Sequence, residues 1–153
     1  MKKQELAKQA WELMYTSHTA KDQILKQLNT DTDLTPQQLR LLLQIGQMNM
    51  STQSEIAQEL DIDLGNLSRL CKTLEEKELI KRTRSNRDLR VVHVELQDEG
   101  RSILQNIERK SLDLLMPFVQ ENTVQELETM VRGMTMYTGL IKDIKESFTV
   151  EPQ

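Results

Sequence analysis

The stretch that most constrains this chain runs from Thr52 to Leu96. It starts with a short helical pattern, TQSEIAQEL, and after a break at residues 61–63 continues with a second one, LGNLSRLCKTLEEKEL, over residues 64–79. The piece that follows, KRTRSNRDLRVVHVEL, ends in alternating apolar and polar residues, which is typical of a strand with one buried face. Two helices, a tight turn and a β-hairpin with a basic tip make a winged helix-turn-helix, whose second helix enters a DNA major groove.

Local capping signals support these helix boundaries. Thr52, with Glu55 three residues later, predicts a capping box at the start of the first helix. Asp63 is well placed to accept a hydrogen bond from a free backbone N–H at the start of the second helix. That second helix then places an apolar stripe inward, made of Leu67, Leu70, Cys71 and Leu74.

The face opposite this stripe carries hydrogen-bonding and cationic side chains, namely Asn66, Ser68, Arg69, Lys72 and Thr73. The hairpin adds four arginines within nine residues: Arg82, Arg84, Arg87 and Arg90. From Arg69 to Arg90, eight basic residues outnumber four acidic ones, although the net charge of the whole chain is −4. A basic patch on an acidic body directs a protein towards a polyanion, and we prefer this interpretation to a merely solvated charged surface.

The order of these motifs resembles the MarR family of bacterial transcription regulators. EIAQEL, NLSRLCKTLEEKELIKR and NRDLRVVHVELQDEG carry the resemblance, which covers nearly the whole chain because helices of suitable length flank them. Its most specific piece is Asp88-Leu89-Arg90, followed by the strand and Gly100. The resemblance implies that Arg90 contacts DNA from the wing and that Asp88 orients it, through a charge-assisted hydrogen bond to the arginine side chain.

Two positions depart from the family pattern. Glu78 stands where glycine is usual, which implies a helix end without the left-handed glycine cap. Gln97 stands where threonine is usual, which leaves the capping of the next helix to Asp98 or to a rearranged turn. Neither position belongs to the predicted DNA-facing set.

Helical patterns flank the winged unit on both sides, over residues 4–28, 37–45, 98–119 and 123–148, and Thr35-Pro36 is a typical helix start. Aromatic residues make up only 3% of the chain, which favours a helical scaffold over a β-sandwich. We therefore predict a mainly α protein. Residues 35–97 form the winged helix-turn-helix DNA-binding domain with a two-stranded wing, and residues 1–34 and 98–153 form a helical dimerisation region.

The last helical pattern is apolar over a broader arc than docking onto its own chain requires. One interpretation is a monomeric bundle; the other, which the resemblance implies and which we favour, is a homodimer formed by both chain ends. A two-fold dimer would present two recognition helices ~34 Å apart, which matches a palindromic operator in double-stranded DNA.

No catalytic or metal-binding pattern is evident. The two histidines, His18 and His93, are far apart in sequence, and a zinc site needs several converging ligands. Cys71, the one cysteine, lies in the inward stripe, where a thiol has a raised pKa and reacts slowly. There is no glycine-rich phosphate loop and no nucleophile–base pair. We expect neither an enzyme nor a bound cofactor or metal.

A single cysteine excludes an internal disulfide and fits a reducing cytoplasm. No apolar run approaches the length of a membrane span, and the first residues lack the apolar core of a signal peptide. We expect a cytoplasmic protein without a membrane partner.

Three functional hypotheses follow. The first is a dimeric, sequence-specific transcriptional regulator, acting as a repressor that a small-molecule effector releases from DNA. The second is a winged-helix protein-interaction module, and the third is a small-molecule binding protein without specific operator binding. The wing favours the first, since an adaptor has no need of Arg84, Arg87 and Arg90 around Asp88.

The resemblance also places a ligand cleft where the first and second helices meet the winged domain. The residues expected there are Trp11, Met14, Tyr15, His18, Leu39 and Leu43. Aromatic bulk with a few polar tips suits an aromatic or phenolic effector. The alternative, which the sequence slightly favours, is that these side chains only fill the core and the dimer interface.

Overall fold

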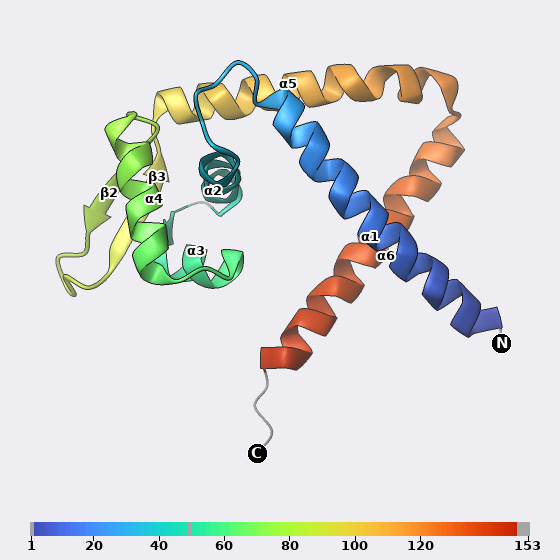
Figure 1. Ribbon diagram of the computed structural model, residues 1–153, viewed down its shortest axis with the longest axis horizontal. Coiled ribbons are helices and arrows are strands. Elements are labelled where there is room, and N and C mark those ends of the chain that lie inside the picture. The colour runs from blue at the N-terminus through green and yellow to red at the C-terminus, as the bar shows by residue number, and fades with distance from the viewer. Residues whose placement is uncertain (1, 49, 150–153) are drawn as a thin grey trace. The chain divides into compact units, whose positions relative to one another are not determined.

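A computed structural model describes residues 2–48 and 50–149 (Figure 1). Residue 49 of the predicted winged domain, and residues 1 and 150–153 of the predicted dimerisation region, lie outside the described residues. The chain divides into two compact units, residues 1–111 and 112–153. The assignment of dimerisation and DNA-binding domains remains a prediction.

The first unit contains the predicted helix-turn-helix and wing, so the mainly α, winged helix-turn-helix class is confirmed. Its elements in chain order are α1 (Lys2–Leu28), α2 (Pro36–Gln47), β1 (Ser51–Thr52), α3 (Gln53–Leu60), α4 (Leu64–Glu76), β2 (Ile80–Arg84), β3 (Val92–Leu96) and the first part of α5 (Asp98–Glu121).

The three strands form an antiparallel sheet in the order β1-β3-β2, with β3 in the centre. Val94 of β3 is buried and lies opposite Ser51 on one side and Arg82 on the other. The sequence pattern did not predict β1, because two residues are too few for an alternation to show. The alternating residues at the end of the hairpin form β3, which begins at Val92.

The predicted helix starts are confirmed in atomic detail. The Thr52 hydroxyl accepts from the backbone N–H of Glu55, while the Glu55 carboxylate accepts from the backbone N–H of Thr52, at 3.2 and 2.7 Å. The carboxylate of Asp63 accepts from the backbone N–H of Asn66 at 2.8 Å. Thr35 caps α2 in the same way as Thr52 caps α3.

The end of α4 differs from the predicted one. The helix ends at Glu76, three residues before Leu79, and Glu78 itself takes the left-handed conformation with φ of 60°. The backbone N–H of Leu79 then donates to the carbonyl of Leu74 at 3.0 Å, and that of Glu78 to Glu75 at 2.9 Å. This is the Schellman arrangement that glycine usually closes. Without glycine, the left-handed residue costs about 1–2 kcal/mol.

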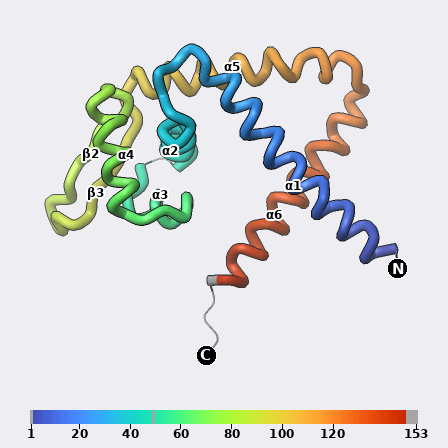
Figure 2. Tube along the Cα trace, viewed as in Figure 1, coloured from blue at the N-terminus to red at the C-terminus, as the bar shows by residue number. Residues whose placement is uncertain are grey.

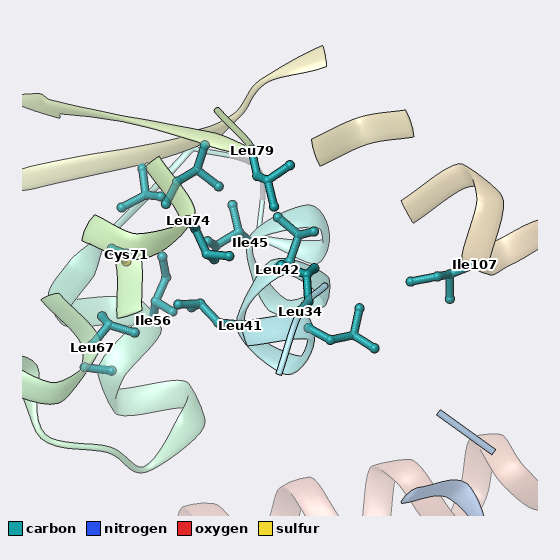
Figure 3. Close-up of a cluster of buried hydrophobic side chains, with 14 of the residues drawn as sticks. Leu34, Leu41, Leu42, Ile45, Ile56, Leu67, Cys71, Leu74, Leu79 and Ile107 are labelled. Carbon is teal, nitrogen blue, oxygen red and sulfur yellow. The ribbon is translucent and has the colours of Figure 1, made fainter. Parts of the chain in front are cut away.

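The core of the first unit lies between α4 and the pair α2 and α3. Figure 3 shows Leu67, Cys71 and Leu74 of α4 pointing towards Ile56 of α3 and Leu41 of α2, and all five side chains are almost completely buried. Each such side chain contributes about 1.5–3 kcal/mol through burial. The inward stripe of α4 is therefore confirmed, and the opposite face of the helix is left free.

Gly100, in the first turn of α5, lies close to the backbone of Leu79, between α4 and β2. A Cβ atom there would lie 2.2 Å from the backbone carbonyl oxygen of Leu79. The same carbonyl accepts from the backbone N–H of Gln97 at 2.9 Å, so it cannot move away without losing a hydrogen bond. α5 begins at Asp98, one residue after Gln97.

The second unit contains the rest of α5 and α6 (Val124–Thr149). Thr123 and Glu126 form a reciprocal capping box at the start of α6. Along both helices large apolar side chains stay exposed within the chain, including Leu114, Leu115, Val131, Met134, Leu140 and Ile144. Among the described residues, no helix is long and apolar enough to cross a membrane.

Substitution of alanine for glycine should change the free energy of unfolding in opposite directions at Gly100 and at Gly133. Gly100→Ala should lower the free energy of unfolding by about 1–3 kcal/mol, because the new methyl group meets a fixed carbonyl. Gly133→Ala in α6, where a Cβ atom would meet nothing within 4 Å, should raise it by about 0.5–1 kcal/mol through helix propensity. Denaturant unfolding at equal protein concentration measures both, and equal effects of the two substitutions would contradict this packing.

Candidate nucleic-acid interface

The free face of α4 carries the residues predicted to contact DNA. Arg69 and Lys72 are exposed, and Asn66, Ser68 and Thr73 are half-buried beside them. Because Leu67, Cys71 and Leu74 occupy the opposite side of the helix, this set cannot turn inward without exposing the core.

Two of these side chains are already ordered by hydrogen bonds within α4. The guanidinium of Arg69 donates to the side-chain oxygen of Asn66 at 2.8 Å, one helical turn earlier. The hydroxyl of Thr73 donates to the backbone carbonyl of Arg69 at 3.2 Å. The first contact restricts the rotamers of Arg69 and leaves its remaining donors free, which reduces the entropy lost when the side chain meets a partner.

The wing consists of β2, β3 and the tip between them, residues 85–91, whose path is clear in the trace of Figure 2. The Ser85 hydroxyl accepts from the backbone N–H groups of Arg87 and Asp88, at 3.2 and 3.4 Å. The backbone N–H of Ser85 donates to Val91 at 2.9 Å, and that of Val91 donates to Asp88 at 3.0 Å. The tip is thus a hydrogen-bonded turn that holds its arginines outward.

The structure shows a contact between Asp88 and Arg90 that differs from the expected one. Its carboxylate accepts from the backbone N–H of Arg90 at 2.9 Å. Among the contacts of the described residues, no ion pair joins this carboxylate to the Arg90 guanidinium. Asp88 therefore shapes the turn from which Arg90 projects, as aspartate does in many tight turns, because its short side chain reaches the backbone two residues ahead.

Two cations of the basic stretch are held by carboxylates of the same chain. The guanidinium of Arg82 is paired with Glu75 at 2.7 Å. Lys77 is paired with Asp33 in the loop between α1 and α2, and its hydrogen bond holds the pKa of the Asp33 carboxyl below the usual value. These side chains stabilise the unit itself.

The other cations are available to a partner. Lys81, Arg84, Arg87 and Arg90 are exposed, and none of their charged groups is paired with a carboxylate in the part of the chain that the structure describes. Lys72 lies 3.8 Å from Glu76, but an exposed pair of this kind contributes little and yields readily to a polyanion. Positive charge therefore gathers on the outer face of α4 and on the wing.

Cys71 is a core thiol, as predicted. The side chain is completely buried, and burial raises the pKa of its thiol to about 11. Within residues 2–48 and 50–149, no three His, Cys, Asp or Glu side chains converge in a way that could hold a metal ion.

The residues predicted to bind an effector differ widely in their exposure to solvent. Trp11 and Tyr15 on α1 are 66% and 74% exposed, whereas Leu39 on α2 is buried in the core. His18 is exposed, and Met14 and Leu43 are half-buried.

A small cavity of about 100 Å³ lies elsewhere in the first unit, between α2 and the start of α4. Leu41, Leu60, Ile62 and Leu70 form its apolar part, and Gln37, Arg40 and Asn66 form its polar part. No sequence pattern indicated this cavity, because its lining comes from two stretches that are distant in sequence, residues 37–41 and 60–70.

The chain is similar to known transcription regulators. The model of the MarR family matches residues 34–92, which include every residue predicted to contact DNA. The multiple antibiotic resistance protein MarR of Salmonella typhimurium is 29% identical over 119 residues, which cover 77% of this chain and 83% of that protein. An uncharacterised HTH-type transcriptional regulator of Bacillus subtilis, YpoP, is 23% identical over 78% of this chain and 89% of the relative.

Solved structures show the same fold. MarR of Escherichia coli in complex with operator DNA aligns with a TM-score of 0.62 at 25% identity, over 82% of this chain and 91% of that one. FabT of Streptococcus pneumoniae, also solved with DNA, aligns with a TM-score of 0.70 at 24% identity, over 86% of this chain and 95% of that one.

The contact of Asp88 with the Arg90 backbone makes a prediction for two substitutions. Asp88→Asn keeps the oxygen that accepts the N–H bond and removes a negative charge. A DNA duplex should therefore bind to this variant at least as tightly as to the wild-type protein. Asp88→Ala removes the acceptor, and binding should weaken by about threefold or more because the turn loosens. Fluorescence anisotropy with one labelled duplex measures both. Equal weakening by the two substitutions would instead indicate that Asp88 acts on the Arg90 side chain through its charge.

Proposed function

We propose that this chain is a winged helix-turn-helix transcription regulator of the MarR type, whose family model matches residues 34–92, and that it binds double-stranded DNA as a homodimer and represses transcription at palindromic operators. The outer face of α4 reads base edges in the major groove, through Asn66, Ser68 and Arg69. Lys72 and Thr73 contact the backbone beside them, and the wing arginines Arg84, Arg87 and Arg90 contact phosphates or the minor groove.

This proposal rests on one observation: some cations of the basic stretch are paired with carboxylates, whereas others are exposed. The carboxylates of Glu75 and Asp33 pair with Arg82 and Lys77, respectively. The cations on the outer face of α4 and on the wing tip stay exposed. A chain with a net charge of −4 that concentrates free cations on one surface is suited to a polyanion and repels it elsewhere. The complex of Escherichia coli MarR with operator DNA supports the same assignment by likeness.

The homodimer is supported by the exposed apolar side chains of the second unit. Leu114, Val131, Met134 and Leu140 are each more than half exposed within the chain, and further large apolar side chains are exposed along the same two helices. A second copy would cover these side chains, and two copies related by a two-fold axis would each present one α4 helix to successive major grooves, ~34 Å apart.

Release by a small effector completes the proposal. The exposed α1 side chains of Trp11, Tyr15 and His18 lie at helical spacing on one face, which suits an aromatic or phenolic compound bound together with Leu43. A regulator of this kind works in the cytoplasm, where it reaches the chromosome, and no catalytic step is part of the proposal.

Selection of duplexes from a random-sequence library by the wild-type protein tests DNA binding directly. We expect an enriched palindrome whose affinity falls steeply as salt rises. Arg84→Ala should reduce the slope of log K against log salt by about one unit, as the loss of one phosphate contact does. Arg69→Ala should cost about 1–3 kcal/mol on the selected duplex and little on unrelated DNA, because it removes a base contact.

Failure to enrich any duplex, or binding that does not respond to salt, would contradict the proposal and favour a protein-interaction module. Equal losses for Arg69→Ala on selected and unrelated DNA would move Arg69 from base reading to backbone contact.

The effector proposal has its own test, because Trp11 is the only tryptophan of the chain. Titration with salicylate-like compounds should change its fluorescence and weaken DNA binding over the same concentration range. Trp11→Phe should abolish the optical signal and keep the loss of DNA binding. A phenolic panel without either effect would leave the repressor without an effector of this class.

A further inference from the structure

We propose that Glu75 and Arg82 form a positioning pair that sets the angle of the wing relative to α4, so that DNA affinity depends on two residues that do not touch DNA. This inference rests on the proposed DNA-binding function and identifies which side chains align its two contact surfaces. From the sequence, Arg82 was grouped with the basic residues of the wing. The contacts of its side chain indicate a different role.

Three bonds join the two residues. One carboxylate oxygen of Glu75 accepts from the backbone N–H of Arg82 at 2.8 Å. The other accepts from Nε of Arg82 at 2.8 Å and lies 2.7 Å from its terminal guanidinium nitrogen. Both oxygens of the carboxylate are therefore used, and the planar guanidinium fixes their direction. The side chains of Arg82 and Glu75 are only 25% and 35% exposed, so water screens the pair less than a surface ion pair.

The position of the pair in the fold lets it control the angle between α4 and the wing. Glu75 lies in the last turn of α4, and Arg82 is the central residue of β2, opposite the buried Val94 of β3. α4 and β2 are in contact along this stretch (Figure 1). Across the part of the chain that the structure describes, no other side chain of α4 forms a hydrogen bond or ion pair with β2 or β3.

The wing tip continues beyond this fixed point. Arg87 follows Arg82 by five residues, which corresponds to about 16 Å of extended chain. A tilt of about 10° at the pair would move the tip by about 3 Å, more than a hydrogen bond to a phosphate tolerates. A hairpin free to tilt would also lose orientational entropy on binding, and the pair removes part of that loss beforehand.

Charge alone makes the opposite prediction for one of the two residues. Glu75 is a carboxylate near a surface that is proposed to face phosphates, so its removal should tighten DNA binding if it acts only through its charge. If it positions the wing, its removal should weaken binding. The direction of the effect therefore separates the two roles.

The experiment measures the affinity and salt slope of Glu75→Ala, Arg82→Ala and the double variant on one duplex, selected by the wild-type protein from a random-sequence library. We expect each single substitution to weaken binding by about fivefold. The double variant should be no weaker than either single one, because the pair is already broken. The salt slope of Arg82→Ala should equal that of wild type, whereas Arg84→Ala, the matched control two residues along β2, should lower it by about one.

Two further variants keep the test decisive if an alanine variant unfolds. Glu75→Gln retains an acceptor for the Arg82 backbone N–H and should restore part of the affinity. Arg82→Lys retains the charge without the two-pronged geometry and should restore less.

Tighter binding by Glu75→Ala, or a slope reduced by one unit in Arg82→Ala, would overturn the inference, since the first result indicates simple repulsion and the second a direct phosphate contact. Wild-type protein that enriches no duplex would instead overturn the proposed function.

Discussion

The burial of Leu67, Cys71 and Leu74 decides which face of α4 is free, and the rest of the interface depends on it. These side chains are 0% exposed and pack against α2 and α3. A rotation of α4 by one residue would bring an apolar side chain into water at about 1.5–3 kcal/mol and turn Arg69 towards an apolar core. Neither change is compensated, so the helix has one stable orientation. The outward set from Asn66 to Thr73 follows from this packing.

Carboxylate side chains determine a second feature of the structure, namely which cations are paired. Glu75 holds Arg82, Asp33 holds Lys77, and Asp31 holds Lys110 of α5. The hydrogen bond from Lys110 keeps the pKa of the Asp31 carboxyl below its usual value, as Lys77 does for Asp33. The loop between α1 and α2 is thereby tied to the end of α4 and to α5. These carboxylates thus select which cations remain free, since they pair with Lys77, Arg82 and Lys110 and leave the exposed cations of the wing unpaired within the described residues.

The sequence predicted the parts of the fold that local interactions determine. The capping box at Thr52 and the N-cap at Asp63 could be predicted because their hydrogen-bond partners lie three residues away in the sequence. β1 was not, since its two residues pair with β3 some forty positions later. The same limit applies to the site: the free face of α4 follows from helical periodicity, whereas the Glu75–Arg82 pair depends on the angle at which β2 leaves the helix. At Glu78 the resemblance implied a helix end without the left-handed glycine cap, but Glu78 itself takes the left-handed conformation, and Leu79 donates to the carbonyl of Leu74.

We propose that α4 and the wing tip together form the DNA-binding surface. Hydrogen exchange of the full chain, with and without a duplex that it has selected, tests this most directly. We expect slower exchange of backbone amides at the start of α4 and in residues 85–91, with no change in the second half of α3. Protection confined to α1 or α6, with the wing tip exchanging as fast as in the free protein, would contradict it.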